Sequence, residues 1–228
     1  FAIVAGLALL AMRVDEPQAE GPRAPIFASI GEGLRFVFNH QIVLGALALD
    51  MFAVLFGGAV ALLPAFIKDI LHAGPDALGI LRAAPAAGAV IVGLWLSNRP
   101  PERGAGRLLL GAVAGFGLCI IGFALSRNMW LSAALLFASG AFDGVSVVLR
   151  STILQLATPD AMRGRVSAIN GIFIGSSNEL GAFESGLAAK LLGLVSSVVF
   201  GGCMTLGIVG VTAKLAPKLR RLDLRELH

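Results

Sequence analysis

Charged side chains are scarce in this sequence of 228 residues. Only 14% of the residues are Asp, Glu, Lys or Arg, whereas 57% are hydrophobic, and the mean hydropathy is +0.85. A soluble globular domain has about 25% charged residues. The composition therefore excludes an ordinary soluble domain and predicts a protein embedded in a lipid bilayer.

Cysteine and histidine are too few, or too unfavourably placed, for several kinds of chemistry. Cys119 and Cys203 each lie in an uncharged apolar run, so we interpret both as packing residues rather than as a disulfide framework. None of the three histidines lies within a long apolar run, and no GxxxxGK[ST] phosphate-binding motif occurs. These absences argue against a zinc or serine–histidine enzyme and against an ATP-driven pump. We therefore expect no enzymatic activity, no cofactor and no bound metal.

Long apolar runs are abundant instead. A helix needs about 20 apolar residues to cross a bilayer, and continuous rather than alternating hydrophobicity favours helices over a barrel. The sequence thus predicts an all-α, polytopic transmembrane helix bundle with six full spans, at residues 42–66, 78–96, 108–125, 130–149, 166–189 and 194–213. The apolar stretch 1–12 is too short to span, so we expect it to be the end of a preceding helix whose start lies outside the chain.

Basic residues orient this bundle. If the connections alternate between the two membrane faces, 14 Lys and Arg residues fall on one face and only a few on the other. Because cytoplasmic loops are enriched in Lys and Arg, we expect the first face to be cytoplasmic, with residues 214–228 as a basic cytoplasmic tail. The positive net charge then follows from membrane orientation, and we expect no nucleic-acid partner.

The segment 13–41 is the longest link between apolar runs. Its first half is charged and rich in proline, which is typical of a linker. Its second half places Ile26, Ile30, Leu34 and Val37 at helical spacing, which predicts a short amphipathic helix in the membrane interface.

Acidic residues inside the spans, and one amide beside them, are the candidates for a substrate and proton pathway. An ionised carboxylate at mid-bilayer costs about 2.5–3.5 kcal/mol, so each should face the bundle interior or a watery cavity. A carboxyl group removed from water can bind and release a proton near neutral pH, as proton-coupled transport requires. By helical rise, two of the acids lie near mid-membrane and the last one near the outer interface. The candidates are Asp50, Asp143, Asn178, Glu179 and Glu184.

These residues also have structural interpretations, which the sequence leaves open. Asp143 precedes Arg150 by seven residues, two helical turns on the same face, and this spacing is also typical of a charge pair near the cytoplasm. Glu184 suits a hydrated position at the interface, and Asn178 suits a hydrogen bond to a neighbouring helix.

The segment 158–166 reads Thr-Pro-Asp-Ala-Met-Arg-Gly-Arg-Val. This order predicts a helix that begins with Thr158 as its N-cap, Pro159 at its first position and an acid in its first turn. The helix then presents Arg163 and Arg165 at the membrane surface.

Together with Ser-Ala-Ile-Asn-Gly at 167–171 and the run 177–186, this segment resembles the region around the eleventh helix of bacterial major facilitator superfamily (MFS) exporters. The branch it resembles includes the enterobactin exporter and macrolide efflux proteins. Gly-Leu-Arg-Phe at 33–36 is similar to the way that branch enters its seventh helix. The resemblance implies the C-terminal half of a twelve-helix transporter: the end of helix 6 at 1–12, a central cytoplasmic linker at 13–41 and helices 7 to 12 at 42–213.

The resemblance also implies a function. It implies proton-coupled efflux by alternating access, an antiporter of the bacterial inner membrane that exports a small amphipathic molecule such as a siderophore or a drug. The implied partners are the lipid bilayer, the cargo, protons and the missing N-terminal six-helix half. Candidate cytoplasmic gate residues are Arg103, Arg107, Arg150, Arg163 and Arg165. The alternatives are a half-transporter that must assemble with itself or with a separate half, and a non-transporting membrane scaffold.

Overall fold

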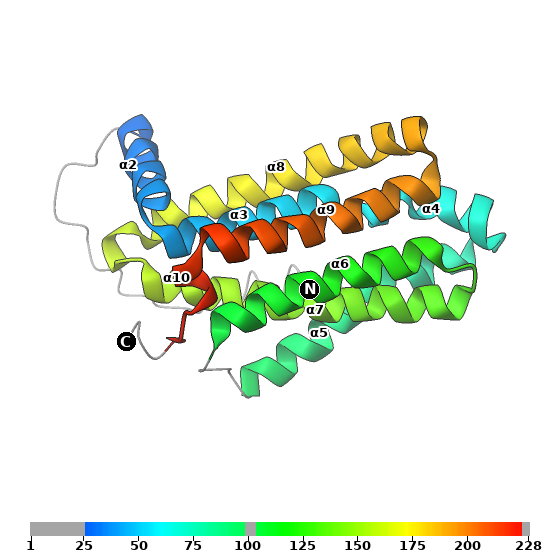
Figure 1. Cartoon of the computed structure of the whole chain (residues 1–228), viewed down its shortest axis with the longest axis horizontal. Coiled ribbons are helices and arrows are strands. Elements are labelled where there is room, and N and C mark those ends of the chain that lie inside the picture. The colour runs from blue at the N-terminus through cyan, green and yellow to red at the C-terminus, as the bar shows by residue number, and fades with distance from the viewer. Residues whose placement is uncertain (1–25, 99–103, 225–228) are drawn as a thin grey trace, which may run out of the picture.

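Helices make up nearly all of the described chain. The computed structural model describes residues 26–98 and 104–224, and neither range contains a strand. The long helices run side by side along one axis, whereas α2 crosses one end of the bundle (Figure 1). The main helices are α2 (Ile26–Asn39), α3 (Gln41–Phe56), α5 (Asp76–Asn98), α6 (Ala105–Leu125), α7 (Met129–Ala157), α8 (Asp160–Leu192), α9 (Leu194–Leu215) and α10 (Pro217–Arg220). The predicted all-α bundle is confirmed, while the helix end expected at 1–12 lies outside the described residues.

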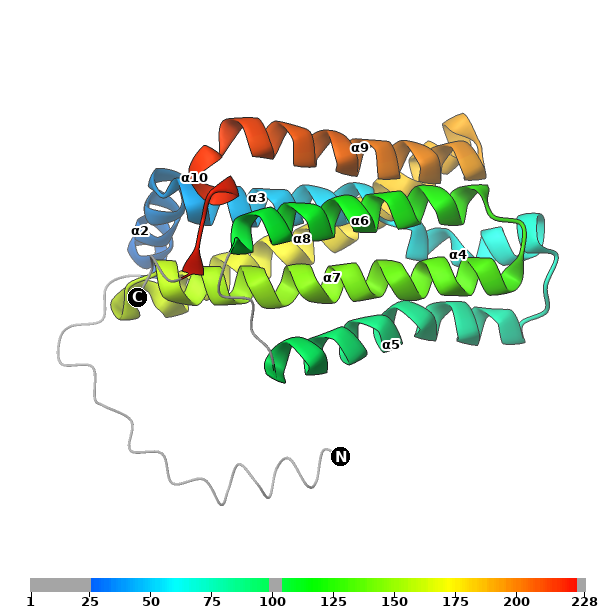
Figure 2. The same cartoon turned by 60° about the horizontal axis from the view of Figure 1, so that its bottom comes forward.

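Five helical stretches within the described ranges are long and apolar enough to cross a membrane, and they coincide with five of the six predicted spans. The sixth predicted span lies in α8, which has 33 residues and is thus long enough. Ser176, Asn178 and Glu179 are among the polar residues that make α8 less apolar than the other five. The sixth predicted span is therefore not among the five because α8 contains more polar residues. Helix α8 still runs alongside the other long helices (Figure 2).

The first span changes helix type along its length. After α3 it passes through a 3-10 turn (η1, Ala59–Leu62), a short α-helix (α4, Leu63–Phe66) and a π-helical turn (η2, Ile67–Leu71). Pro64 lies at the start of α4, where its missing N–H does not break the helix. The change begins at Gly57 and Gly58, which other helices approach closely: a Cβ on Gly57 would lie 2.6 Å from the Phe116 ring of α6.

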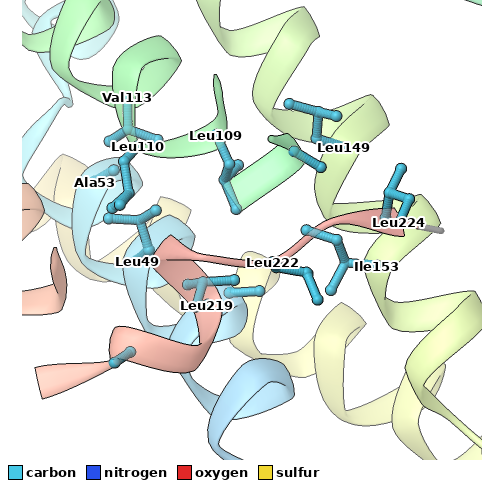
Figure 3. Close-up of a cluster of buried hydrophobic side chains, with 13 residues drawn as sticks. Leu49, Ala53, Leu109, Leu110, Val113, Leu149, Ile153, Leu219, Leu222 and Leu224 are labelled. Carbon is cyan, nitrogen blue, oxygen red and sulfur yellow. The ribbon is translucent and has the colours of Figure 1, made fainter. Parts of the chain in front are cut away.

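The order of packing places α7 between α5 and α6, with α9 against α6, and α3 against α8, α9 and α7. Three apolar clusters among the described residues hold this arrangement together. One lies toward the end that carries η2 and the short turns, and includes Phe66 and Phe123 with ring centroids 4.6 Å apart. The second lies near α10 and is built on Leu49, Leu109 and Leu149 (Figure 3). The third joins α2, α3, α7 and α8 around Val37, Leu47 and Ile169.

Segment 214–224 contributes to the second cluster as well as carrying charge. Leu219, Leu222 and Leu224 are buried in that cluster, and the amide N–H of Gly106 donates to the carbonyl of Leu222 at 3.3 Å. Basic residues of the same segment stay exposed; they are Lys214, Lys218, Arg220 and Arg221. We call this end of the bundle, with α2 and α10, the basic end.

The junction between α7 and α8 corrects one sequence prediction. Thr158 is the C-cap of α7 rather than the N-cap of α8, Pro159 takes the N-cap position and α8 begins at Asp160. The Thr158 hydroxyl is buried and makes no hydrogen bond within the described residues. The predicted acid in the first turn is Asp160, which forms an ion pair with Arg163 at 2.8 Å. The prediction failed because α7 continues eight residues beyond the apolar run that ended at residue 149.

The amphipathic pattern at 26–37 does form a helix, α2. Its residue Val37 is fully buried, and a Cβ on Gly33 would meet the side chain of Ile169 in α8. The carboxylate of Glu32 also pairs with Arg165 at 2.5 Å. Helix α2 is therefore fixed to the start of α8. The proline-rich first half of the link, at 13–25, lies outside the described residues.

Glycine permits a close contact between α5 and α7. A Cβ on Gly140 of α7 would overlap the carbonyl oxygen of Pro85 in α5, and a Cβ on Gly144 would lie 3.0 Å from Ala89. This pair thus has the packing role typical of small residues four apart. By contrast, a Cβ on Gly171 or Gly175 of α8 would meet nothing within 4 Å.

We expect Gly140→Ala to lower the free energy of unfolding by about 1–3 kcal/mol, because the added methyl forces α5 and α7 apart. The measurement is unfolding of the detergent-solubilised protein by increasing fractions of a denaturing detergent, followed by circular dichroism. Gly111→Ala is the matched control, because a Cβ there meets nothing within 4 Å. Equal effects of the two substitutions would contradict this packing.

Candidate functional site

A buried ion pair joins α3 to α7. The Oδ1 atom of Asp50 contacts the Nη1 atom of Arg150, and their side chains are only 8% and 5% exposed. The Nε–H of Arg150 has no hydrogen-bond partner among the described residues. Two opposite charges therefore compensate each other inside the bundle, with few other polar contacts to support them.

Apolar neighbours surround the pair on both helices. Leu49 precedes Asp50 and Leu149 precedes Arg150, and both leucines are fully buried in the cluster at the basic end (Figure 3). Val113 of α6 closes the same region. Removing one charge from such surroundings leaves the other without a counter-charge, which is far more costly than losing both.

Asp143 lies beside this ion pair. It is on α7, two turns before Arg150, and it lines a small cavity together with Asp50 and Ser146. The volume of this cavity is about 20 Å³, which is room for about one water molecule. Asp143 makes no ion pair within the described residues. Two acids and one arginine from two helices thus converge at this point.

A larger cavity adjoins the first, because Asp143 lines both. Its volume is about 310 Å³, and α5, α6, α7 and α8 contribute to its wall, along with the glycines that follow α3. Pro85, Gly140 and Asn178 are among its lining residues. This size is at the lower end of pockets that hold small organic ligands. Asp143 therefore stands between the buried ion pair and a ligand-sized space.

The acids of α8 lie elsewhere. Glu179 is exposed and Glu184 is half-buried, and neither lines one of these two cavities. Asn178 donates its Nδ2–H to the carbonyl of Ile174 at 3.0 Å, within its own helix. The structure thus brings together Asp50, Asp143 and, across the larger cavity, Asn178, and it leaves Glu179 and Glu184 apart from them.

The arginines grouped by sequence as gate residues separate into different environments. Arg150 was predicted to lie at the cytoplasmic face, in the connection after the fourth span. It is instead buried within α7, seven residues before that helix ends. Arg163 donates its Nε–H to the carbonyl of Gln155 at 3.2 Å, and Arg165 pairs with Glu32. Arg107 is exposed in the first turn of α6. Arg103 lies outside the described residues.

Sequence reasoning associated Arg150 with Asp143 and missed its pairing with Asp50. The depth of the two residues in the membrane could have indicated this pairing. Asp50 lies nine residues from the start of α3 and Arg150 seven residues from the end of α7, and both of these ends are at the basic end. The two residues are therefore at similar depths, about 14 Å and 11 Å into their helices. Within the described residues, no group of three His, Cys, Asp or Glu side chains is arranged to hold a metal ion.

Comparison with known proteins shows which family the chain resembles. The family model described as transmembrane secretion effector matches residues 1–228. The enterobactin exporter EntS of Escherichia coli strain SMS-3-5 and that of Shigella boydii serotype 18 are each 29% identical to the chain over 198 residues. These matches cover 85% of the chain and 47% of each relative, so the chain spans about half the length of the curated relatives it matches. No solved structure matches the chain.

We expect Arg150→Met to lower the free energy of unfolding by about 3–5 kcal/mol, because it leaves the Asp50 carboxylate buried and unpaired. The double variant Asp50→Asn/Arg150→Met should lose less than Arg150→Met alone. Both are measured by the same detergent-induced unfolding.

The control is Glu32→Gln, which breaks an exposed pair and should cost about 0–1 kcal/mol. If Arg150→Met cost no more than this control, the buried pair would not have the importance assigned to it.

Proposed function

Because the chain belongs to the transmembrane secretion effector family of the major facilitator superfamily, we propose that it forms the C-terminal half of a proton-coupled efflux permease. The permease exports a small amphipathic molecule, such as a siderophore or a drug, by alternating access. The resemblance to MFS exporters noted from the sequence is confirmed by the family match. The bundle of apolar helices agrees with a multi-pass membrane protein.

The observation that carries the proposal is the position of Asp143 between the Asp50–Arg150 ion pair and the larger cavity. A proton that enters from this cavity reaches Asp143 first and then Asp50, through a space with room for about one water molecule. Among the residues that line the small cavity, Asp50 and Asp143 are the titratable ones, and Arg150 is the charged group in contact with Asp50. Proton binding is thereby linked to a contact between two helices.

Protonation of Asp50 would remove its negative charge and leave Arg150 without a counter-charge. The guanidinium then pairs with Asp143, on the same face of α7. This exchange frees α3 from α7 and leaves the arginine compensated in both states, so the energetic cost of moving between them stays low. Deprotonation of Asp50 restores the first state. Two alternative pairings of one arginine thus supply the two conformations that alternating access requires.

A second six-helix half would cover the outward face of α8. Asn178 and Glu179 are exposed on that helix, and Gly171 and Gly175 have open space around them. Small residues allow close approach of another helix. The cargo path would then lie between the halves, with Glu179 and Glu184 near it, and Arg107, Arg163 and Arg165 near its cytoplasmic mouth. In this orientation the basic end and the C-terminus are cytoplasmic and the membrane is the bacterial inner membrane.

The alternative functions are tested by the same reconstitution. The chain spans about half the length of its curated relatives, so a half-transporter that assembles with itself or with a separate half is the second candidate. A non-transporting membrane scaffold is the third.

In liposomes that contain the full-length permease, with this chain as its C-terminal half, and an internal pH-sensitive dye, we expect a gradient of enterobactin, used as a probe cargo, to drive proton flux. Asp50→Asn and Asp143→Asn should each abolish this flux, because both remove a proton-binding step. Asp69→Asn, which neutralises an exposed acid at the opposite end, is the control and should retain it.

Flux from this chain reconstituted alone would support the half-transporter that assembles with itself. Flux from separately made halves, but from neither half alone, would support assembly with a separate half. Silence of the full-length permease and of the chain, in protein whose helical circular dichroism is intact, would contradict transport of this cargo and favour the scaffold.

A second prediction concerns α8. We expect Glu179→Gln to impair export more than Glu184→Gln, because Glu179 lies nearer the middle of the span and Glu184 lies eight residues from the end of the helix. Export is measured as loss of cargo from preloaded cells that carry each variant at equal abundance. Equal impairment would contradict the assignment by depth.

A further inference from the structure

An apolar groove separates α3 from α9 toward the basic end. Its volume is about 830 Å³, and the residues along it are almost all apolar. Ala48 and Phe52 belong to the α3 wall, and Gly207, Val211 and Leu215 to the α9 wall. Several of these side chains are widely exposed, including Leu215 at 73% and Val211 at 55%. The groove is therefore open on the side away from the bundle interior.

The groove is long enough to hold an acyl chain over the full depth of one leaflet of a bilayer. It extends along α3 from Gln41 to Phe56, which is about 22 Å of helical rise. One leaflet of the hydrocarbon core is about 15 Å thick. The polar residues that line the groove are Asn39, Gln41 and Thr212, which are all at the basic end. The Gln41 side chain closes that end by donating to the carbonyl of Leu215 at 3.1 Å.

Positive charge gathers where the groove meets the membrane surface. Lys214 follows Gly207 by seven residues, so it lies on the groove side of α9. Lys218 follows in α10, and both lysines are exposed. No acidic residue lines the groove within the described residues. An apolar channel that ends at two cations is complementary to a molecule with a hydrocarbon chain and an anionic head.

We propose that this groove binds an anionic phospholipid, with one acyl chain between α3 and α9 and its phosphate group at Lys214 and Lys218. The acyl chain packs against the exposed apolar side chains, which face the hydrocarbon region when the helices span a bilayer. The phosphate accepts hydrogen bonds from the two ammonium groups, which remain at the level of the lipid headgroups. This site is separate from the Asp50–Arg150 pair and does not depend on the transport proposal.

The test uses a tryptophan reporter in the groove. Phe52→Trp introduces it, and Trp95→Phe and Trp130→Phe remove the two exposed tryptophans elsewhere. The protein is reconstituted in phosphatidylcholine, and phosphatidylglycerol with brominated acyl chains is titrated in. Quenching of the reporter measures occupancy of the groove, and the same titration with brominated phosphatidylcholine gives the selectivity for the anionic head.

Two pairs of variants separate the contribution of the lipid's acyl chain from that of its headgroup. Gly207→Leu fills the groove, and Gly210→Leu is its control: in both cases a Cβ meets nothing within 4 Å, but Gly210 does not line the groove. Lys214→Gln/Lys218→Gln removes the cations, and Lys190→Gln removes an exposed cation from the last turn of α8 at the opposite end.

We expect phosphatidylglycerol to quench the reporter at lower concentration than phosphatidylcholine. Gly207→Leu should abolish the quenching by both lipids, whereas Gly210→Leu should not. Removal of the lysines should reduce the preference for phosphatidylglycerol by about fivefold for each lysine, and Lys190→Gln should leave it unchanged. Equal quenching by the two lipids in the reporter protein would overturn the anionic site. Absence of quenching by either lipid would mean that protein, such as a second copy or segment 1–25, covers the groove, and this would overturn the proposal as well.

Discussion

One buried pair of opposite charges, Asp50 and Arg150, constrains the way in which this bundle can pack. Neither residue can be removed from water alone without a large cost, so α3 and α7 must meet at the depth where the two charges coincide. The apolar cluster around Leu49 and Leu149 depends on the same register. The fold therefore stabilises a contact that is strong while both groups are charged and becomes unfavourable when one is neutralised.

A second acid lies beside this ion pair. Asp143 offers the arginine a second partner, and the cavity between the acids is large enough for about one water molecule. Close packing of α5 on α7 at Gly140 holds the wall of the larger cavity in place. In the proposed mechanism, the glycine contacts fix one part of α7, and the exchange of ion-pair partners moves another. The apolar groove between α3 and α9 lies along another face of α3, so the proposed lipid would contact the same helix.

Much of the fold could be predicted from the sequence, because span length and continuous hydrophobicity follow directly from the bilayer. The helix at 26–39 was predicted from a different pattern, the helical spacing of its apolar residues. Two features were beyond these rules. Helix α7 extends past residue 149, so Arg150 is internal and Thr158 ends a helix instead of starting one. Leu219, Leu222 and Leu224 are buried although their segment reads as a basic tail.

Asp50 and Asp143 could be selected from the sequence as candidates because a charge inside an apolar run is conspicuous. The contact between Asp50 and Arg150 could not be predicted, because the partner of a buried charge is set by tertiary packing. Protonation of Asp50 should break its pair with Arg150. Infrared difference spectra of the protein in liposomes, taken between neutral and acidic buffer, measure protonation of its carboxyl groups. We predict that Asp50→Asn removes one of the protonated-carboxyl bands that appear as pH falls and leaves that of Asp143 in place; a difference spectrum that Asp50→Asn leaves unchanged would contradict this.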